Sequence, residues 1–188
     1  MFIQTESTPN PATLKFLPGQ TVLEMGTADF PNADSAGQSP LAGRVFGVNG
    51  VTGVFFGQDF VTVTKSDSVE WDHIKPGILG AIMEHFQSGD PVMAGDAAKP
   101  AGGHAEHEGE DSGIVTQIKE LLDTRVRPAV AQDGGDITFH GFDRGVVYLH
   151  MQGACAGCPS STLTLKMGIE NLLRHYIPEV TEVRPVAV

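Results

Sequence analysis

The sequence is poor in cysteine, in basic residues and in long apolar runs, and each shortage excludes a class of protein. Two cysteines among 188 residues cannot form a disulfide framework, which favours a reducing compartment. Twelve Lys and Arg against 23 Asp and Glu leave a net charge of −11 with no basic stripe, so we expect no nucleic-acid partner. No apolar run approaches the roughly 20 residues of a membrane span, so no membrane association is expected. Residues 1–5 lack the basic start and apolar middle of a signal peptide.

Residues 1–92 have the pattern of a small α+β domain. Alternating or β-branched runs predict strands at residues 2–5, 13–17, 22–25, 51–56 and 60–64. Ser39 followed by Pro40 predicts the start of a short helix, and a longer helix is expected over 72–88, beginning firmly only after Lys75 because of Pro76. This segment holds no cysteine and no nucleophile–base pair, so we expect it to recognise a partner rather than to catalyse.

Residues 93–111 differ in composition, being rich in Ala, Gly, Glu and His without periodicity. We interpret them as a flexible acidic linker in which nothing fixes the backbone, so the two flanking domains are expected to move independently. His104 and His107 are three apart and could offer two imidazoles to a metal. A solvated, disordered segment is the favoured interpretation.

Residues 112–188 predict a second small α+β domain with the order α-β-β-α-β. The first helix begins at Asp111 or Ser112 and is bent or restarted by Pro128. Strands are expected at 137–140, 146–151 and 180–186, and an apolar stripe marks the second helix at Leu165, Ile169, Leu172, Leu173 and Tyr176. Asp133 and Asp136 flank a Gly-Gly pair, which is more typical of turn chemistry than of hard-metal ligands.

The two cysteines, Cys155 and Cys158, lie in a glycine-rich loop just before the second helix. Gly153 and Gly157 let the backbone curl, and Pro159 suits a first helical turn whose positive end should lower the pKa of both thiols. Such a pair serves structural zinc, thiol–disulfide exchange or an iron–sulfur cluster. Zinc needs four ligands, and the chain has no histidine at finger spacing. A thioredoxin-like enzyme would place the pair after the first strand of a βαβ unit, which is not the order here. A cluster takes four thiolates, which two chains would supply together.

Both predicted domains resemble those of one known family. The N-terminal domain of Nfu-type iron–sulfur scaffold proteins is similar to this chain at residues 1–5, 8–11, 15–16, 18–19, 39–41 and 53–57. Their NifU-type C-terminal domain is similar at residues 118–125, 133–136 and 153–161. The resemblance covers nearly the whole chain apart from the linker, with the two domains in the right order.

The resemblance implies a scaffold or carrier, not an enzyme. Its cargo would be a [4Fe-4S] cluster held between the subunits of a homodimer, with Cys155 and Cys158 as ligands, and passed to acceptor apoproteins. Upstream cluster assembly proteins would be further partners. A bacterial cytoplasm is the simpler location because no transit peptide precedes Met1, with the mitochondrial matrix as the alternative. A CxxC thiol–disulfide oxidoreductase remains the alternative function.

Overall fold

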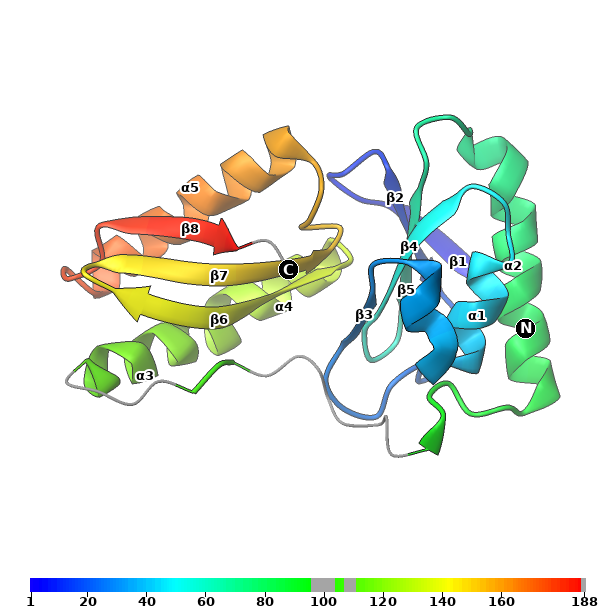
Figure 1. Ribbon diagram of the computed structural model, residues 1–188, viewed down its shortest axis with the longest axis horizontal. Helices are drawn as coiled ribbons and strands as arrows, with labels where there is room; N and C mark the ends of the chain where they lie inside the picture. Colours follow the sequence, from blue (N-terminus) through cyan, green and yellow to red (C-terminus); the bar gives the residue numbers. More distant parts are fainter. Residues whose placement is uncertain (96–103, 107–110, 187–188) are drawn as a thin grey trace.

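The computed structural model describes residues 1–95, 104–106 and 111–186, and Figure 1 shows two units, each with its own sheet and helices. The N-terminal unit has a five-stranded antiparallel sheet in the order β1-β2-β5-β4-β3. Its elements are β1 (Gln4–Ser7), β2 (Thr13–Leu17), β3 (Ala28–Phe30), η1 (Ala33–Gln38), α1 (Pro40–Phe46), β4 (Val51–Phe56), β5 (Val61–Lys65) and α2 (Trp71–Ser88).

The two faces of this sheet pack against different parts of the molecule. One face meets α1 and α2 in a core that includes Phe16, Phe56 and Val63. Side chains alternate along a strand, so the residues between them point the other way. Lys15, Phe55 and Thr62 are all buried on that second face, although the helices cover only the first. The second face is turned toward the C-terminal unit (Figure 1).

The C-terminal unit is a three-stranded sheet in the order β6-β7-β8 with helices packed around one core. Its elements are α3 (Ser112–Leu121), the π-helical turn η3 (Leu122–Val126), α4 (Arg127–Gln132), β6 (Gly135–Asp143), β7 (Val146–Gly153), α5 (Pro159–Tyr176) and β8 (Glu182–Val186). β6 and β7 are antiparallel, whereas β7 and β8 are parallel and are joined through α5. The α+β fold class and the order α-β-β-α-β are therefore confirmed.

Two element predictions for the N-terminal unit are wrong. Residues 22–25 are not a strand, because the amides of Val22 and Leu23 both donate to the Gln58 carbonyl instead of to a ladder, and the third strand is β3. α2 begins at Trp71 and contains Pro76. A proline this near the start of a helix removes only one intrahelical hydrogen bond, and the buried Ile74 and Ile78 hold the first turns against the core.

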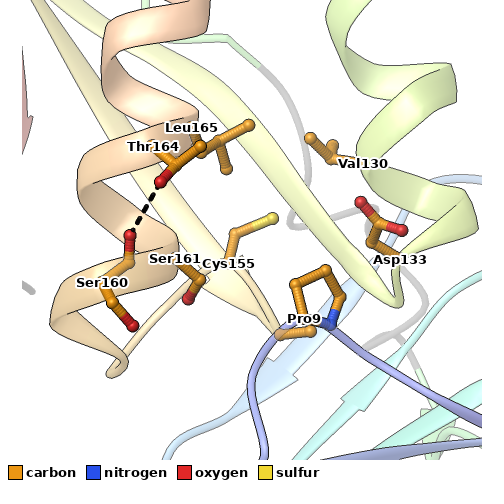
Figure 2. Close-up of a pocket in the computed structure, with 9 residues that line it drawn as sticks. Pro9, Val130, Asp133, Cys155, Ser160, Ser161, Thr164 and Leu165 are labelled. Carbon is orange, nitrogen blue, oxygen red and sulfur yellow. Dashed lines mark hydrogen bonds between the residues drawn. The ribbon is translucent and has the colours of Figure 1, made fainter.

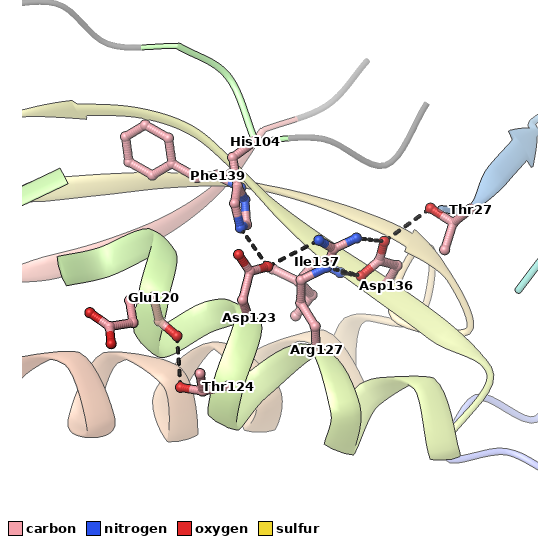
Figure 3. Close-up of polar contacts among 9 residues, drawn as sticks. All are labelled: Thr27, His104, Glu120, Asp123, Thr124, Arg127, Asp136, Ile137 and Phe139. Carbon is pink, nitrogen blue, oxygen red and sulfur yellow. Dashed lines mark hydrogen bonds and ion pairs between the residues drawn. The ribbon is translucent and has the colours of Figure 1, made fainter. Parts of the chain in front are cut away.

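The linker is anchored at one point, contrary to the expectation that nothing fixes its backbone. The Ala105 amide donates to the Phe139 carbonyl at 2.8 Å, and the Phe139 amide donates to His104 Nδ1 at 2.8 Å (Figure 3). The linker therefore pairs with the outer edge of β6, which covers an otherwise open strand edge. Among the described residues, no helix has the length and apolar character needed to cross a membrane.

Candidate functional site

The cysteine loop connects the last residue of β7 to the first turn of α5. Gly153 has φ +61° and Gly157 has φ +83°, so both occupy the left-handed region that glycine tolerates without strain. The Ala156 amide donates to the Gly153 carbonyl at 3.1 Å, which closes a turn around Cys155. The curled backbone expected from the glycines is thus confirmed, and Cys158 is the N-cap residue of α5.

Cys158 lies at the outer end of this loop as a free, partly exposed thiol. Its Sγ lies 3.4 Å from Ser160 Oγ. Hydrogen bonds from the Ser160 and Ser161 side chains, and then from their backbone amides, lower the pKa of the Cys158 thiol to about 7. The lowered pKa expected for this cysteine is therefore confirmed in direction, although its main cause is the serine hydroxyls rather than the helix end.

Cys155 lies in a different environment, and the expectation of a lowered pKa is wrong for it. Its side chain is free but only 5% exposed, and Figure 2 shows its sulfur pointing into a pocket between α5 and α4. Burial, and to a smaller extent the carboxylates of Asp136 and Asp133, together raise the pKa of the Cys155 thiol to about 12. The thiol of Cys158 therefore ionises more readily than the buried thiol of Cys155.

The turn at residues 133–136 lies against the buried cysteine. A Cβ at Gly135 would overlap Cys155 Sγ, so this position has no room for a side chain. Asp136 forms an ion pair with Arg127, whose Nε and Nη2 donate to its two carboxylate oxygens at 2.9 and 2.8 Å (Figure 3). Its Oδ1 also accepts the Ile137 amide at 2.8 Å. Asp136 therefore forms an ion pair with Arg127, which the sequence did not predict, since it favoured turn chemistry over metal binding there.

The histidine alternative for metal binding finds no support at His104. This imidazole accepts the Phe139 amide at Nδ1, and its Nε2 lies 2.9 Å from Asp123 Oδ1 (Figure 3). Both ring nitrogens are therefore engaged in holding the linker, and His107 lies outside the described residues. Within the described ranges, no group of three or more His, Cys, Asp and Glu side chains is arranged to hold a metal ion.

The unequal thiols predict unequal reactivity. At pH 7.5 we expect iodoacetamide to label Cys158 quickly, with a labelling midpoint near its pKa of about 7, whereas Cys155 stays largely unlabelled until the pH is far higher. Replacing Ser160 with alanine removes the hydroxyl whose hydrogen bond lowers the pKa of Cys158 the most, and should raise that midpoint. Peptide mass spectrometry across a pH series measures both, with Ser66→Ala as the control. Equal labelling of the two thiols would contradict this prediction.

Comparison with known proteins identifies the family. A family model described as "Scaffold protein Nfu/NifU N terminal" matches residues 3–89, and one described as "NifU-like domain" matches residues 118–184. "NifU-like protein 5, mitochondrial" of Arabidopsis thaliana is 57% identical over 182 residues, covering 96% of this chain and 66% of that protein. The human "NFU1 iron-sulfur cluster scaffold homolog, mitochondrial" is 51% identical over 187 residues, covering 99% of this chain and 72% of that protein. The chain belongs to the Nfu/NifU family.

The chain spans about two thirds of the length of these Nfu/NifU relatives. Among solved structures, the solution NMR structure of a NifU-like protein from Saccharomyces cerevisiae is 29% identical, with a TM-score of 0.46. That match covers 51% of this chain and 87% of the yeast chain.

Sequence reasoning missed the residues that contact the cysteine loop from the N-terminal unit. Asn10 Nδ2 donates to the Ala156 carbonyl, between the two cysteines, at 3.0 Å. Residues 8–11 lie between two predicted strands, and their two prolines explain a turn there without any contact to another unit. The one available signal was an asparagine in a fixed, proline-flanked loop, but nothing local indicated a partner 146 positions away.

Proposed function

We propose that this chain is an iron–sulfur cluster scaffold that holds a [4Fe-4S] cluster between two subunits and transfers it to acceptor apoproteins. The observation that carries the proposal is the pair of free cysteines, Cys155 and Cys158, at the start of α5 in a chain of the Nfu/NifU family. Thiolates are the ligands that iron–sulfur clusters take, and the cluster is the cargo of the protein rather than a resident cofactor.

The number of thiols supports a cluster shared between subunits. This chain contributes two cysteine sulfurs, whereas a cluster with full cysteine ligation needs four. Two copies meeting at their cysteine loops supply that number, and separation of the copies frees the ligands. Cluster binding also releases protons, because both thiols bind as thiolates. The pKa of Cys158 is lowered to about 7, so this thiol loses its proton to a metal more readily than Cys155 does.

The same proposal assigns a separate role to each of the three parts of the chain. Residues 1–92 recognise partner proteins, residues 93–111 are the linker, and residues 112–188 bind the cluster. Acceptor apoproteins and upstream assembly proteins are the proposed partners, and no substrate is turned over. The mitochondrial names of the relatives agree with the matrix as the location and do not address a bacterial cytoplasm.

Anaerobic reconstitution tests the proposal. Purified, reduced protein given ferrous iron, sulfide and a thiol reductant should turn brown and bind about two iron and two sulfide ions per chain, which is one [4Fe-4S] cluster per dimer. Light scattering after gel filtration should show the brown species as a dimer. A protein that stays colourless and monomeric, or a cluster held fully by one chain, would contradict the proposal.

The oxidoreductase alternative is tested on the same preparation. It requires a reversible Cys155–Cys158 disulfide and reduction of insulin disulfides by the metal-free protein. The expected result is no turnover above that of the free dithiol reductant. Turnover that disappears in Cys158→Ser would favour the alternative instead.

A further inference from the structure

The second face of the N-terminal sheet makes specific contacts with the C-terminal unit, although the two units were expected to move independently. Thr62 Oγ1 donates to the Gly134 carbonyl at 2.7 Å, and Lys15 Nζ donates to the Gln132 carbonyl at 3.0 Å. Thr27 Oγ1 donates to Asp136 Oδ2 at 3.0 Å, in addition to the Asn10 contact with Ala156. We call the four donors Asn10, Lys15, Thr27 and Thr62 the donor face.

The polarity of these contacts is one-sided. Every one of the four hydrogen bonds has its donor in the N-terminal unit and its acceptor in the C-terminal unit. The acceptors belong to two segments only, residues 132–136 from the end of α4 to the start of β6, and the cysteine loop. Lys15 also places a positive charge at the last carbonyl of α4, where the negative end of a helix favours a cation. The two surfaces are therefore complementary in hydrogen bonding and in charge.

Burial of the donors shows that this is a built interface. Asn10 is 3%, Lys15 7% and Thr62 0% exposed, and a buried donor without a partner would be costly. Lys15 Nζ also lies 3.4 Å from Glu6 Oε2 within its own unit, whereas the Asn10 side-chain amide donates to the other unit. Backbone approach is also close, since a Cβ at Gly134 would lie 2.7 Å from Thr62 Oγ1 and one at Gly153 would lie 2.9 Å from the Phe55 ring.

Side chains of the N-terminal unit border both cavities that reach Cys155. The pocket in Figure 2, about 370 Å³ in volume, is bordered by Pro9 beside Asp133 and the Cys155 sulfur. A second cavity that reaches Cys155 from the other side is lined by Asp29 and Pro31. Each opening thus contains side chains from the N-terminal unit, and the loop of residues 8–11 lies over the peptide between the two cysteines.

We infer that the N-terminal unit is a cap for the cysteine loop, and that the donor face is a binding surface whose partner is the C-terminal unit of the same chain. In the capped chain Cys158 stays accessible, whereas Cys155 lies in the core of the C-terminal unit and the N-terminal unit borders the openings that reach it. Two capped chains that meet would therefore present only the Cys158 thiol of each, short of the four ligands of a shared cluster. It follows, resting on the proposed function, that the cap must open before two chains share a cluster.

The cap is tested on the full-length, metal-free, reduced chain, so the outcome does not depend on cluster binding. The test variant combines Asn10→Asp with Thr62→Val. Aspartate keeps the oxygen that accepts the Ala12 amide at 3.0 Å but replaces the donor to Ala156 with a repelling oxygen. Valine keeps the shape of Thr62 and removes its hydroxyl. The matched control combines Asn49→Asp with Thr116→Val, the same chemical changes at two exposed positions outside the interface.

Two measurements report on the cap. Amide hydrogen exchange in peptides covering residues 132–135 and 153–158 should be about tenfold faster in the test variant than in the wild-type protein. Maleimide labelling of Cys155 should also rise about tenfold at fixed pH, with Cys158 in the same molecule as the internal reference. The control variant should match the wild-type protein in both. Labelling and exchange of the test variant within twofold of wild type, with its fold intact by circular dichroism, would overturn the inference.

A third measurement needs no variant. Small-angle X-ray scattering of the wild-type chain should fit the capped arrangement of Figure 1, with the two units in contact. A scattering curve that requires separated units would overturn the inference even if the test variant failed to fold. Because iron and sulfide are absent from all three measurements, failure of cluster reconstitution would contradict the proposed function and leave the cap standing.

Discussion

Replacing Cys155 with serine is expected to remove the cluster almost completely, with bound iron falling about tenfold or more after anaerobic reconstitution. This prediction is a stringent test of the ligand assignment, because Cys155 has the properties of a poor ligand in the capped chain. It is 5% exposed, and burial together with Asp136 and Asp133 raises the pKa of its thiol to about 12. If Cys155 were only a core residue, the serine variant would load as well as the wild-type protein.

The measurement is the iron and sulfide content per chain together with the visible absorbance of the cluster. Cys158→Ser should lose the cluster to the same extent, because a dimer of either variant keeps only half of its thiolates. Thr164→Ser is the matched control, since Thr164 lines the same pocket but offers no sulfur. Retention of a full cluster by either cysteine variant would refute the assignment of that cysteine as a ligand.

Replacing Arg127 with methionine is expected to lower the free energy of unfolding of the C-terminal unit by about 3 kcal/mol. Arg127 holds the Asp136 carboxylate with two donors, and the Asp136 side chain is only 5% exposed. The hydrogen bond to Asp136 is the largest cause that raises the pKa of Arg127 above its usual value. Methionine would leave a nearly buried carboxylate without its cation, and this uncompensated charge is the source of the loss.

Urea unfolding followed by circular dichroism measures this loss. The double variant Arg127→Met with Asp136→Asn should lose less stability than Arg127→Met alone, because the uncompensated charge is then gone. Arg184→Met is the control, since Arg184 is exposed, its partner Glu182 is far less buried than Asp136, and such surface pairs contribute little. An Arg127→Met protein whose stability stays within about 1 kcal/mol of wild type would contradict the buried-pair interpretation.

Much of the fold was predictable because it depends on neighbours along the chain. Ser39 accepts the Ala42 amide as the N-cap of α1, and this interaction spans three residues. The stripe on α5 buries Ile169 and Leu173 as its period predicts, although Tyr176 at the helix end is 49% exposed. The glycine-rich cysteine loop and its position before α5 follow from residues 153–159 alone.

The difference between the two cysteines was not predictable in this way. Cys155 and Cys158 share one loop and one helix start, so local reasoning assigned both a lowered pKa. The Cys158 shift comes from Ser160 and Ser161, which are its neighbours in sequence. The Cys155 shift comes from burial in the core and from carboxylates about twenty positions earlier, which only the folded chain brings close.

The sequence by itself determined the two α+β units, the place of the cysteine pair at the start of a helix, and the number of thiols, which is half of what the proposed cluster takes. Only the tertiary structure decided that Cys155 is buried, that the linker pairs with β6, and that Asn10 holds the peptide between the cysteines. The physical reason is the distance along the chain over which each kind of interaction acts. Capping, periodicity and turn chemistry act over a few residues, whereas desolvation and the hydrogen bonds of the donor face join residues up to 146 positions apart.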